Sequence, residues 1–392
     1  MWGVLMDNDA DQAYPIMPGA LLGVLGGGQL GAMFAMAARS MGYRVAVITD
    51  TENCPAARHA DRLHVGSYTD VSFLAQAAKD LSVVTFEFEN VPAAAGETLK
   101  AEVPVRPCPE VLYTTQNRER EKAFLVDRGI PCGRHAVVRS EKELHDAAGV
   151  IGLPAVLKTA AFGYDGKGQE IIKTTSDIGH AWERLGRATC VLEEWIDFQC
   201  ELSVVAARGL DGAVVAFPAI RNEHRNHILD VSSCPAELPA EVLGEAEHLA
   251  AIVLAELQVV GVSCIEFFLT QENCLLVNEI APRTHNSGHL TIESCPTSQF
   301  EQQVRAICGL PLGVTAPLTP AAMANVLGDC WHAGVPDWEG VLALPGANLH
   351  LYGKEEPRPG RKMGHITVTA ETTAEAIACA RQARDVASSR SQ

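Results

Sequence analysis

Residues 262–289 read VSCIEFFLTQENCLLVNEIAPRTHNSGH, and this stretch contains two apolar runs that each carry one glutamate. The runs at 264–269 and 274–280 predict two antiparallel strands, joined by a two-residue loop at Glu272 and Asn273. A loop of that length places Glu266 directly opposite Glu279 on one face of the hairpin. The stretch therefore predicts an antiparallel sheet that carries two facing carboxylates.

Two facing carboxylates repel each other by roughly 4 kcal/mol at a separation of about 4 Å and an effective dielectric of about 20. Like charges placed opposite each other destabilise a sheet, whereas a divalent cation between them makes the arrangement favourable. Oxygen ligands beside a phosphate suit Mg²⁺, or Mn²⁺, better than zinc. We expect Glu266 and Glu279 to bind this metal; a slipped register that puts one glutamate in solvent is the alternative.

The segment directly after the second strand concentrates cationic, amide and imidazole groups at Arg283, His285 and Asn286. Such donors predict a loop that binds a small anion, with surface hydrogen bonding as the alternative. His285 and His289 have the i, i+4 spacing of a zinc-protease pair. The glutamate of that motif is absent and Gly288 disfavours a helix, so we do not expect zinc.

Residues 26–31 (GGGQLG) fit the pattern G-x-G-x-x-G between an apolar strand and a helical pattern. Backbone N–H groups at such a turn, together with the helix N-terminus, attract an anion. Asp50, at the end of the next strand, would complete a dinucleotide site, but a nucleotide monophosphate fits the turn equally well. A purely structural turn is the third interpretation.

A second glycine-rich loop, GYDGKGQ at 163–169, follows a predicted strand that carries Lys158. Three glycines are tolerable where the main chain closes over a ligand, and a simple hairpin tip is the alternative. A Walker loop is excluded because no G-K-[ST] follows. Further on, Glu193, Glu194 and Glu201 predict either a nucleoside site with a carboxylate on the ribose hydroxyls or an exposed strand end.

The chain divides into three predicted domains after a flexible extension at 1–19. Residues 20–115 alternate strands with helices, which predicts a parallel α/β layer. Prolines precede a boundary near 115, after which 116–197 predict a small α+β domain and 198–392 a larger antiparallel sheet. The predicted strands of the first domain are 20–26, 44–49, 61–65 and 83–88.

The 392-residue chain has 31 Lys and Arg against 48 Asp and Glu, a formal net charge of −17. This balance, without any basic run, disfavours nucleic acid and anionic membrane as partners. No apolar run reaches the roughly 18 residues of a membrane span, and the first twenty residues lack the cationic start of a signal peptide. Twelve cysteines without a C-x-x-C pair predict reduced thiols, and hence a cytoplasmic protein.

In this order, the motifs resemble the ATP-grasp superfamily and, within it, the 5-(carboxyamino)imidazole ribonucleotide synthase family of purine biosynthesis. This chain departs from the family pattern at two positions: it has Ala32 where the family commonly has Arg, and Asn117 where the family commonly has Asp. The resemblance covers about residues 20–370. The stretches that carry it are GGGQLG (26–31), TFEFENV (85–91), QNREREK (116–122), GYDGKGQ (163–169), EEWI (193–196) with Glu201, NEIAPRTHNSGH (278–289), TSQFE (297–301) and GLPLG (309–313).

The resemblance implies an ATP-grasp fold with a Rossmann-like (preATP-grasp) N-terminal domain, a small lid domain and a C-terminal antiparallel-sheet domain, assembled as a homodimer. It implies an ATP-dependent carbon–nitrogen ligase that carboxylates aminoimidazole ribonucleotide with bicarbonate. Bicarbonate is a poor electrophile, so ATP first converts it to carboxyphosphate, and ADP and phosphate are released.

The resemblance also implies roles for matching residues. Mg²⁺ would be held by Glu266 and Glu279. Arg283, His285 and Asn286 would bind bicarbonate and stabilise carboxyphosphate, with Tyr164, Asp165 and Lys354 as further catalytic residues. The ribonucleotide would contact Gly28, Gln29, Leu30, Glu87, Lys354 and Arg361. The ATP-binding residues would be Arg118, Lys158, Gly163, Tyr164, Asp165, Gly166, Lys167, Gly168, Gln169, Glu193, Glu194, Trp195, Ile196, Glu201, His224, Asn278 and Glu279.

Three other functions remain open at this point. Another ATP-grasp carboxylate–amine ligase would share the nucleotide and metal residues. A nicotinamide-dependent oxidoreductase would use residues 26–31 and Asp50 but leave the Glu266 and Glu279 pair without a role, and titration with NADH would distinguish it. A catalytically inactive nucleotide sensor would need losses among the phosphate or metal ligands, and none is apparent.

Overall fold

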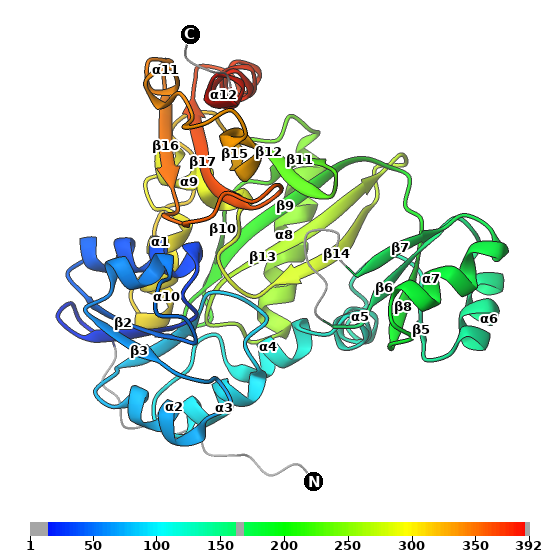
Figure 1. The fold of residues 1–392 in the computed structure, drawn as a ribbon, viewed down its shortest axis with the longest axis horizontal. Coiled ribbons are helices and arrows are strands. Elements are labelled where there is room, and N and C mark those ends of the chain that lie inside the picture. The colour runs from blue at the N-terminus through cyan, green and yellow to red at the C-terminus, as the bar shows by residue number, and fades with distance from the viewer. Residues whose placement is uncertain (1–14, 162–167, 389–392) are drawn as a thin grey trace.

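A computed structural model describes residues 15–161 and 168–388. Three sheets organise them: a parallel sheet near the N-terminus, a small antiparallel sheet, and a large sheet that extends to the C-terminal strands (Figure 1). Most of the extension predicted at 1–19 and five residues of the second glycine loop, Gly163, Tyr164, Asp165, Gly166 and Lys167, lie outside the described residues.

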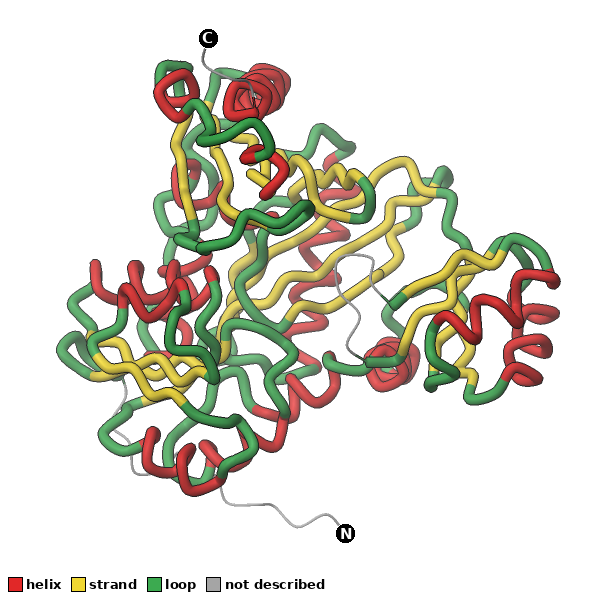
Figure 2. Tube along the Cα trace, in the orientation of Figure 1, coloured by secondary structure: helices red, strands yellow, loops and turns green. Residues whose placement is uncertain are grey.

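The N-terminal sheet is parallel, with the strand order β3-β2-β1-β4, as the alternating pattern predicted. Helices cover both faces of the sheet (Figure 2), and β1, β2 and β4 are mostly apolar and buried, whereas the edge strand β3 is largely exposed. The strands are β1 (Leu21–Leu25), β2 (Arg44–Thr49), β3 (Arg62–Val65) and β4 (Val83–Phe86), and the helices are α1 (Gln29–Ser40), η2 (Pro55–His59), α2 (Val71–Ala78), α3 (Ala93–Lys100) and α4 (Pro109–Thr115).

The small sheet has the antiparallel order β5-β8-β6-β7 and follows helix α5 (Arg118–Asp127). Its helices pack on the sheet through a separate apolar cluster that includes Leu144, Ile178 and Trp182. The elements are β5 (His135–Val138), α6 (Glu141–Ile151), β6 (Ala155–Thr159), β7 (Gln169–Ile172), η3 (Thr175–Asp177), α7 (Ile178–Arg184) and β8 (Cys190–Glu194).

The large sheet has nine strands in the order β14-β13-β9-β11-β12-β15-β17-β16, with β10 paired to β9. Helix α8 (Ala240–Glu256) covers one face of β9, β13 and β14 and forms the largest core with them (Figure 1). The strands are β9 (Phe198–Arg208), β10 (Val214–Ala216), β11 (Ile220–Arg225), β12 (Ile228–Cys234), β13 (Gly261–Thr270), β14 (Leu275–Ala281), β15 (Ala321–Leu327), β16 (Ala347–Leu351) and β17 (Lys362–Thr369).

The remaining helices connect this sheet to its neighbours. Helix α10 (Gln299–Cys308) packs against α1, and its Val304 and Ile307 join the core of the parallel sheet. Helix α12 (Thr373–Ser388) packs on β15 and β17. The others are η4 (Ser287–Leu290), α9 (Thr291–Ser294), η5 (Gly328–Trp331) and α11 (Trp338–Leu342).

The hairpin of β13 and β14 pairs Glu266 with Glu279, as predicted, but its loop differs from the prediction. The pairing runs from Leu269 opposite Leu275, and Thr270 N donates to Cys274 O, so the loop has three residues rather than two. A β-bulge at Asn278 then shifts the register by one residue. The longer loop and the bulge compensate each other, which restores the predicted pairing of the two glutamates.

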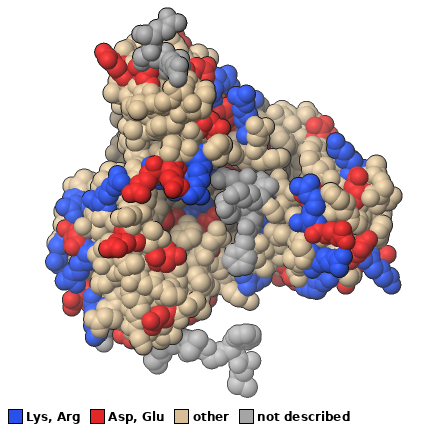
Figure 3. All heavy atoms as spheres, viewed as in Figure 1, with Lys and Arg blue, Asp and Glu red and all other residues tan. Residues whose placement is uncertain are grey.

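All twelve cysteines carry free thiols. Within the described ranges, no helix is both long enough and apolar enough to cross a bilayer. Acidic and basic side chains are interspersed over the face in Figure 3, where Lys and Arg form no continuous patch.

Candidate active site

A cleft of about 1580 Å³ lies where the three sheets meet. It is lined by side chains from the parallel sheet, the small sheet, the large sheet and the β16–β17 loop. Of the site residues that the family resemblance implies and the structure describes, only Gly28 is not part of the lining. The cleft brings together Gln29, Leu30, Glu87, Arg118, Lys158, Gly168, Gln169, Glu193, Glu194, Trp195, Ile196, Glu201, His224, Glu266, Asn278, Glu279, Arg283, His285, Asn286, Lys354 and Arg361.

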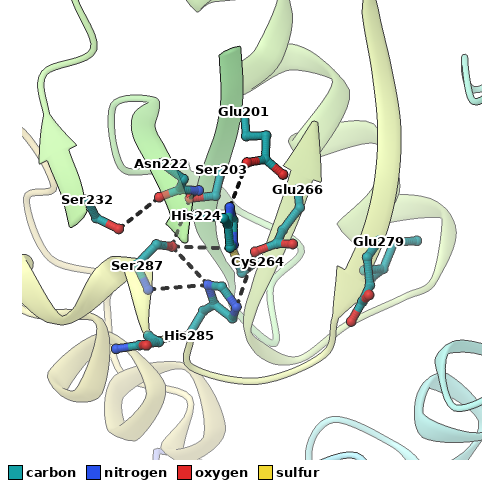
Figure 4. A network of polar contacts seen from close by, with 12 residues as sticks. Glu201, Ser203, Asn222, His224, Ser232, Cys264, Glu266, Glu279, His285 and Ser287 are labelled. Carbon is teal, nitrogen blue, oxygen red and sulfur yellow. Dashed lines mark hydrogen bonds and ion pairs between the residues drawn. The ribbon is translucent and has the colours of Figure 1, made fainter. Parts of the chain in front are cut away.

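Glu266 and Glu279 project from neighbouring strands on the cleft side of the hairpin (Figure 4). Burial raises the pKa of Glu266, and the neighbouring charge of Glu279 raises it further. Beside them, Asn278 has a buried Oδ1 without a hydrogen-bond partner among the described residues. These oxygens suit a hard divalent cation. The described residues contain no group of three His, Cys, Asp or Glu that could hold a metal, so ligand oxygens or water would have to complete the shell.

Three cations and two carboxylates form the part of the cleft nearest the small sheet. Lys158 Nζ lies 2.9 Å from Glu193 Oε2, and Lys122 Nζ lies 3.7 Å from the same oxygen. Arg118 Nη1 lies 3.4 Å from Glu279 Oε2. The second oxygen of Glu193, Oε1, is buried without a partner among the described residues. The cluster therefore presents several cationic donors around a small number of anions, which suits a polyphosphate.

The pKa values in this cluster follow from burial and from the neighbouring charges. Burial opposes the charged form of Glu193, but Lys158, Lys122 and Arg118 outweigh it and lower its pKa to about 2. Burial lowers the pKa of Lys158, and the charges of Arg118 and Lys122 lower it further against the opposing effect of Glu193. A bound anion would relieve this crowding of positive charge.

Glu201 and His224 form a pair on β9 and β11, with 2.6 Å between Oε2 and Nδ1. Burial alone would lower the pKa of His224, but the hydrogen bond and charge of Glu201 raise it. Behind this pair, a chain of hydrogen bonds runs from Ser232 through Asn222 and Ser203 to Ser287 (Figure 4).

Ser287 ends this chain at His285, whose ring is fixed in one protonation state. Ser287 Oγ lies 2.8 Å from His285 Nδ1, and the Ser287 backbone N–H, which can only donate, lies 3.4 Å from the same nitrogen. Burial holds the pKa of His285 well below its usual range, and Arg283 adds to the effect. The neutral ring therefore carries its proton on Nε2, which lies 3.3 Å from Glu266 Oε1.

Arg283 and Asn286, the other predicted anion ligands, each have a protein partner that the sequence did not indicate. Arg283 makes a two-point ion pair with Glu89 through Nε and Nη2. Asn286 and Asn325 exchange two amide hydrogen bonds, of 3.1 Å and 2.8 Å. Gln299 holds the loop by accepting from His285 N and donating to His285 O.

The first glycine turn differs from the prediction because its anion is part of the chain. The N–H groups of Gly28 and Gly31 donate to the carboxylate of Glu87, at 2.5 Å and 3.0 Å. A Cβ on Gly28 would lie 2.5 Å from Glu87 Oε1, so glycine is required there by close approach. Asp50 accepts from the Thr51 hydroxyl and is not part of the cleft lining, which does not favour the dinucleotide alternative.

The other predicted residues lie at the rim. Glu194 accepts from Arg134, and Trp195 next to it is half-exposed. Lys354 Nζ donates to Lys362 O, and Arg361 Nη1 donates to Glu356 O, which places both cations on the β16–β17 loop. Lys122, which the sequence analysis did not assign to the site, is fully buried and donates to Asn278 O.

Both departures from the family pattern have a structural account. Asn117 caps α5, with Oδ1 accepting from the N–H groups of Glu119 and Arg120. Asp and Asn are equally good at this position. Ala32 is buried on α1 against the core of the parallel sheet.

Comparison with known proteins agrees with this arrangement. Family models match the chain in three consecutive segments: a ribonucleotide synthetase preATP-grasp domain over residues 20–116, an ATP-grasp domain over 123–300, and a phosphoribosylaminoimidazole carboxylase C-terminal domain over 321–378. The chain is 44% identical over 352 residues to the N5-carboxyaminoimidazole ribonucleotide synthase of Bacillus subtilis, covering 90% of this chain and 92% of that protein. The chain belongs to the N5-carboxyaminoimidazole ribonucleotide synthase family.

Other members of the synthase family support the same assignment. The Pseudomonas aeruginosa synthase is 42% identical over 88% of this chain and 94% of its own length. The solved Thermus thermophilus synthetase has 37% identity and a TM-score of 0.87, with 95% of this chain and 99% of that chain covered. The Aspergillus clavatus enzyme, in complex with ADP and 5-aminoimidazole ribonucleotide, has 32% identity and a TM-score of 0.86 over 94% of this chain and 98% of that chain.

Proposed function

We propose that this chain is an ATP-dependent ligase that converts 5-aminoimidazole ribonucleotide and bicarbonate to N5-carboxyaminoimidazole ribonucleotide in purine biosynthesis. The single observation that carries the proposal is that one cleft contains two groups of anion-binding side chains. One is the cationic cluster, and the other is the loop that was predicted to bind a small anion; the residues are Arg118, Lys122 and Lys158 in the cluster and Arg283 and His285 in the loop. Membership of the synthase family gives the substrate. The three sheets would correspond to domains at 20–115, 116–197 and 198–392.

The chemistry requires bicarbonate to be made electrophilic. An oxygen of bicarbonate attacks the γ-phosphorus of ATP, the bond to ADP breaks, and carboxyphosphate forms. The exocyclic amine of the ribonucleotide then bonds to the carboxyl carbon, either directly or through released CO₂. Phosphate leaves with the bridging oxygen, and the nitrogen loses a proton.

We assign the phosphate groups of ATP to Arg118, Lys158, Lys122 and Gln169, with the nucleoside near residues 193–196, Glu201 and His224. His285 Nε2–H and Arg283 would donate to the carbonate oxygens, where charge develops during transfer. Asn286 would support the loop through Asn325. The proposed roles of Tyr164 and Asp165 lie in residues outside the described ranges.

Mg²⁺ is the cation that the residues fit best. Glu266, Glu279 and Asn278 Oδ1, which has no partner among the residues that the structure describes, offer oxygen ligands next to the cluster assigned to phosphate. Bound there, the ion would neutralise charge on the phosphate oxygens. In its absence the two carboxylates repel each other, which is consistent with the raised pKa of Glu266 that burial and Glu279 produce.

We assign the ribonucleotide to the part of the cleft formed by Gln29, Leu30, Lys354 and Arg361. Two cations on the β16–β17 loop would bind its phosphate. Glu87 would support this part of the cleft indirectly, because its carboxylate accepts from Gly28 and Gly31 and so fixes the turn around Gln29. We also propose that the enzyme is a homodimer, which light scattering would detect as twice the 41.9 kDa of one chain.

Oxygen transfer tests the carboxyphosphate route. Turnover with ¹⁸O-labelled bicarbonate should place one label in each phosphate released, because the attacking oxygen stays on phosphorus. The exchange of bicarbonate with water is measured in parallel without enzyme. Unlabelled phosphate, at a time when the bicarbonate still carries its label, would eliminate carboxyphosphate as the intermediate.

A further inference from the structure

The stretch TFEFENV contains two glutamates, and only the first has been given a role. Strand β4 ends at Phe86, so Glu87 and Glu89 both leave the carboxyl edge of the parallel sheet. Glu87 binds the glycine turn. Glu89 instead reaches Arg283, which lies 194 positions further along the chain.

The contact between Glu89 and Arg283 is a two-point ion pair across the cleft. Arg283 Nη2 donates to Glu89 Oε1 at 2.7 Å, and Arg283 Nε donates to Glu89 Oε2. The side chains are only 15% and 25% exposed, so water screens the pair weakly. The main chain of Glu89 is held as well, because Gln116 Nε2 donates to its carbonyl at 2.5 Å.

The geometry of the guanidinium group decides what this contact can do. Arginine has five N–H donors in one plane, with one edge formed by Nε and Nη2 and another by Nη1 and Nη2. Glu89 occupies the first edge, and Nη1 also donates to Thr284 O at 3.1 Å. One N–H on Nη1 and one on Nη2 have no partner among the described residues, and Arg283 lines the cleft.

We propose that Glu89 is a positioning residue: it holds one edge of the Arg283 guanidinium so that the other edge is presented to bicarbonate. This inference rests on the proposed function of the same cleft. Glu89 does not touch the substrate and acts only through Arg283. Since Glu87 and Glu89 leave one strand end, a single segment orders both the turn beside the ribonucleotide and the arginine that faces the carbonate.

The first test is a set of steady-state measurements on the full-length chain with Glu89→Gln. The glutamine cannot accept both N–H groups of the arginine edge, so Arg283 gains rotational freedom. We expect the KM for bicarbonate to rise about tenfold, the loss that one charge-assisted hydrogen bond produces, while the KM for ATP changes less than twofold. Glu97→Gln, which removes an exposed carboxylate from α3 of the same domain, is the matched control.

A double-mutant cycle separates positioning from a general structural effect. Arg283→Lys replaces the guanidinium with an ammonium, which has no second edge for Glu89 to orient. Adding Glu89→Gln to this variant should therefore change the KM for bicarbonate less than twofold. An additive effect in the double variant would overturn the proposal, and so would an unchanged KM in Glu89→Gln. A lowered KM would also overturn it, because Glu89 would then compete with bicarbonate for Arg283.

Two further outcomes are decided by the same series. If Glu89→Gln does not fold, Glu89→Asp keeps the charge at a shorter reach. A raised KM for bicarbonate with an unchanged KM for ATP in that variant supports the proposal, and an unchanged KM for bicarbonate contradicts it. Wild-type ATP turnover that does not depend on bicarbonate would contradict the proposed function itself, and with it this inference.

Discussion

At the scale of single residues, the most informative feature is that charged side chains are buried beside one another at the cleft. Glu266 and Glu279 share one face of a hairpin, and Lys122 and Lys158 share one carboxylate. Burying such groups costs free energy unless a partner compensates them. The arrangement is explained if a cation and a polyphosphate complete it.

Glu279→Gln tests the cation half of this explanation. The amide keeps the shape of the side chain but removes one charge, so the apparent Mg²⁺ requirement should rise at least about tenfold, or about 1.4 kcal/mol. Folding should be retained because the repulsion with Glu266 is also removed. Mg²⁺ titration of ATP turnover is the measurement, with Glu272→Gln in the exposed hairpin loop as the control. An unchanged Mg²⁺ requirement would remove Glu279 from the metal site.

Lys158→Met tests the phosphate half. The variant loses a charge-assisted hydrogen bond worth about 1.5–3 kcal/mol, so ATP affinity should fall by a factor of roughly 10 to 150. Calorimetric titration with ATP measures this directly. Lys173→Met, an exposed lysine that follows β7, should bind ATP normally. Equal affinity in wild type and Lys158→Met would place the phosphates elsewhere.

The residue types at the site were largely predictable from the sequence, whereas their protein partners were not. The motifs identified Arg283 and Asn286 without indicating their partners Glu89 and Asn325. They also identified Lys158 and Glu193 without indicating that Lys122 shares this carboxylate. These partners come from segments far away in the sequence, and their sequence spacing does not predict the contacts. The glycine turn shows the same limit, because the pattern predicts an anion but cannot tell a ligand phosphate from the carboxylate of Glu87.

At the scale of elements, the β13–β14 hairpin shows how a correct pairing can follow from an incomplete argument. The observed loop is one residue longer than the predicted loop, which shifts the pairing by one position. The bulge at Asn278 shifts it back, so that Glu266 again lies opposite Glu279. Bulges commonly redirect side chains next to functional sites. Here Asn278 lies at the bulge beside Glu279, and its Oδ1 has no hydrogen-bond partner in the described part of the chain.

The N-terminus of α5 gives a prediction at the scale of elements. Asn117→Ala removes an acceptor for two N–H groups, so it should lower the free energy of unfolding by about 1 kcal/mol. ATP affinity should fall too, because Arg118 follows the cap directly. Asn117→Asp should be neutral in both respects. Thermal unfolding of the three proteins measures the first effect, and equal midpoints for wild type and Asn117→Ala would contradict it.

A buried aromatic and histidine cluster behind the cleft gives a prediction about pH. His365 on β17 stacks on His350 at 4.4 Å, approaches His289 at 4.7 Å, and bonds Tyr352 at 3.0 Å. Burial holds the pKa of His365 well below its usual range, and the two neighbouring histidines add to this. As the pH falls, His365 therefore takes up a proton in the unfolded chain before it does so in the folded protein. The stability that neutral His365 contributes is lost as the pH falls below the pKa of the unfolded chain, about 6.5.

His365→Asn should consequently be least harmful in acid. Its destabilisation relative to wild type should shrink by about 1.4 kcal/mol per pH unit below about pH 6.5. Unfolding at a series of pH values measures the difference, which cancels the contributions of other titrating groups. His248→Asn on the exposed face of α8 should show no such trend. A constant difference across pH would mean that the pKa of His365 is the same in the folded and the unfolded protein.

At the scale of the whole molecule, three sheets from consecutive parts of the chain lie around one region (Figure 1). Residues from all three line the cleft. The sequence pattern was enough to predict the parallel sheet and a small α+β domain after it. It did not predict β11 or the extension of the large sheet through β12, β15 and β17. Strand β11 reads IRNEHR, and its consecutive polar residues 221–224 all line the cleft, so hydrophobic alternation could not identify it as a strand.

The central claim is that this whole arrangement transfers a carboxyl group from bicarbonate to an amine at the expense of ATP. Turnover with ¹³C-labelled bicarbonate, ATP and 5-aminoimidazole ribonucleotide, each omitted in turn, tests it most directly. We predict a new ¹³C carbamate signal that appears in step with ADP, one for one, and only when all three substrates are present. ADP formation that needs no bicarbonate or ribonucleotide, or ADP without the carbamate signal, would contradict the claim.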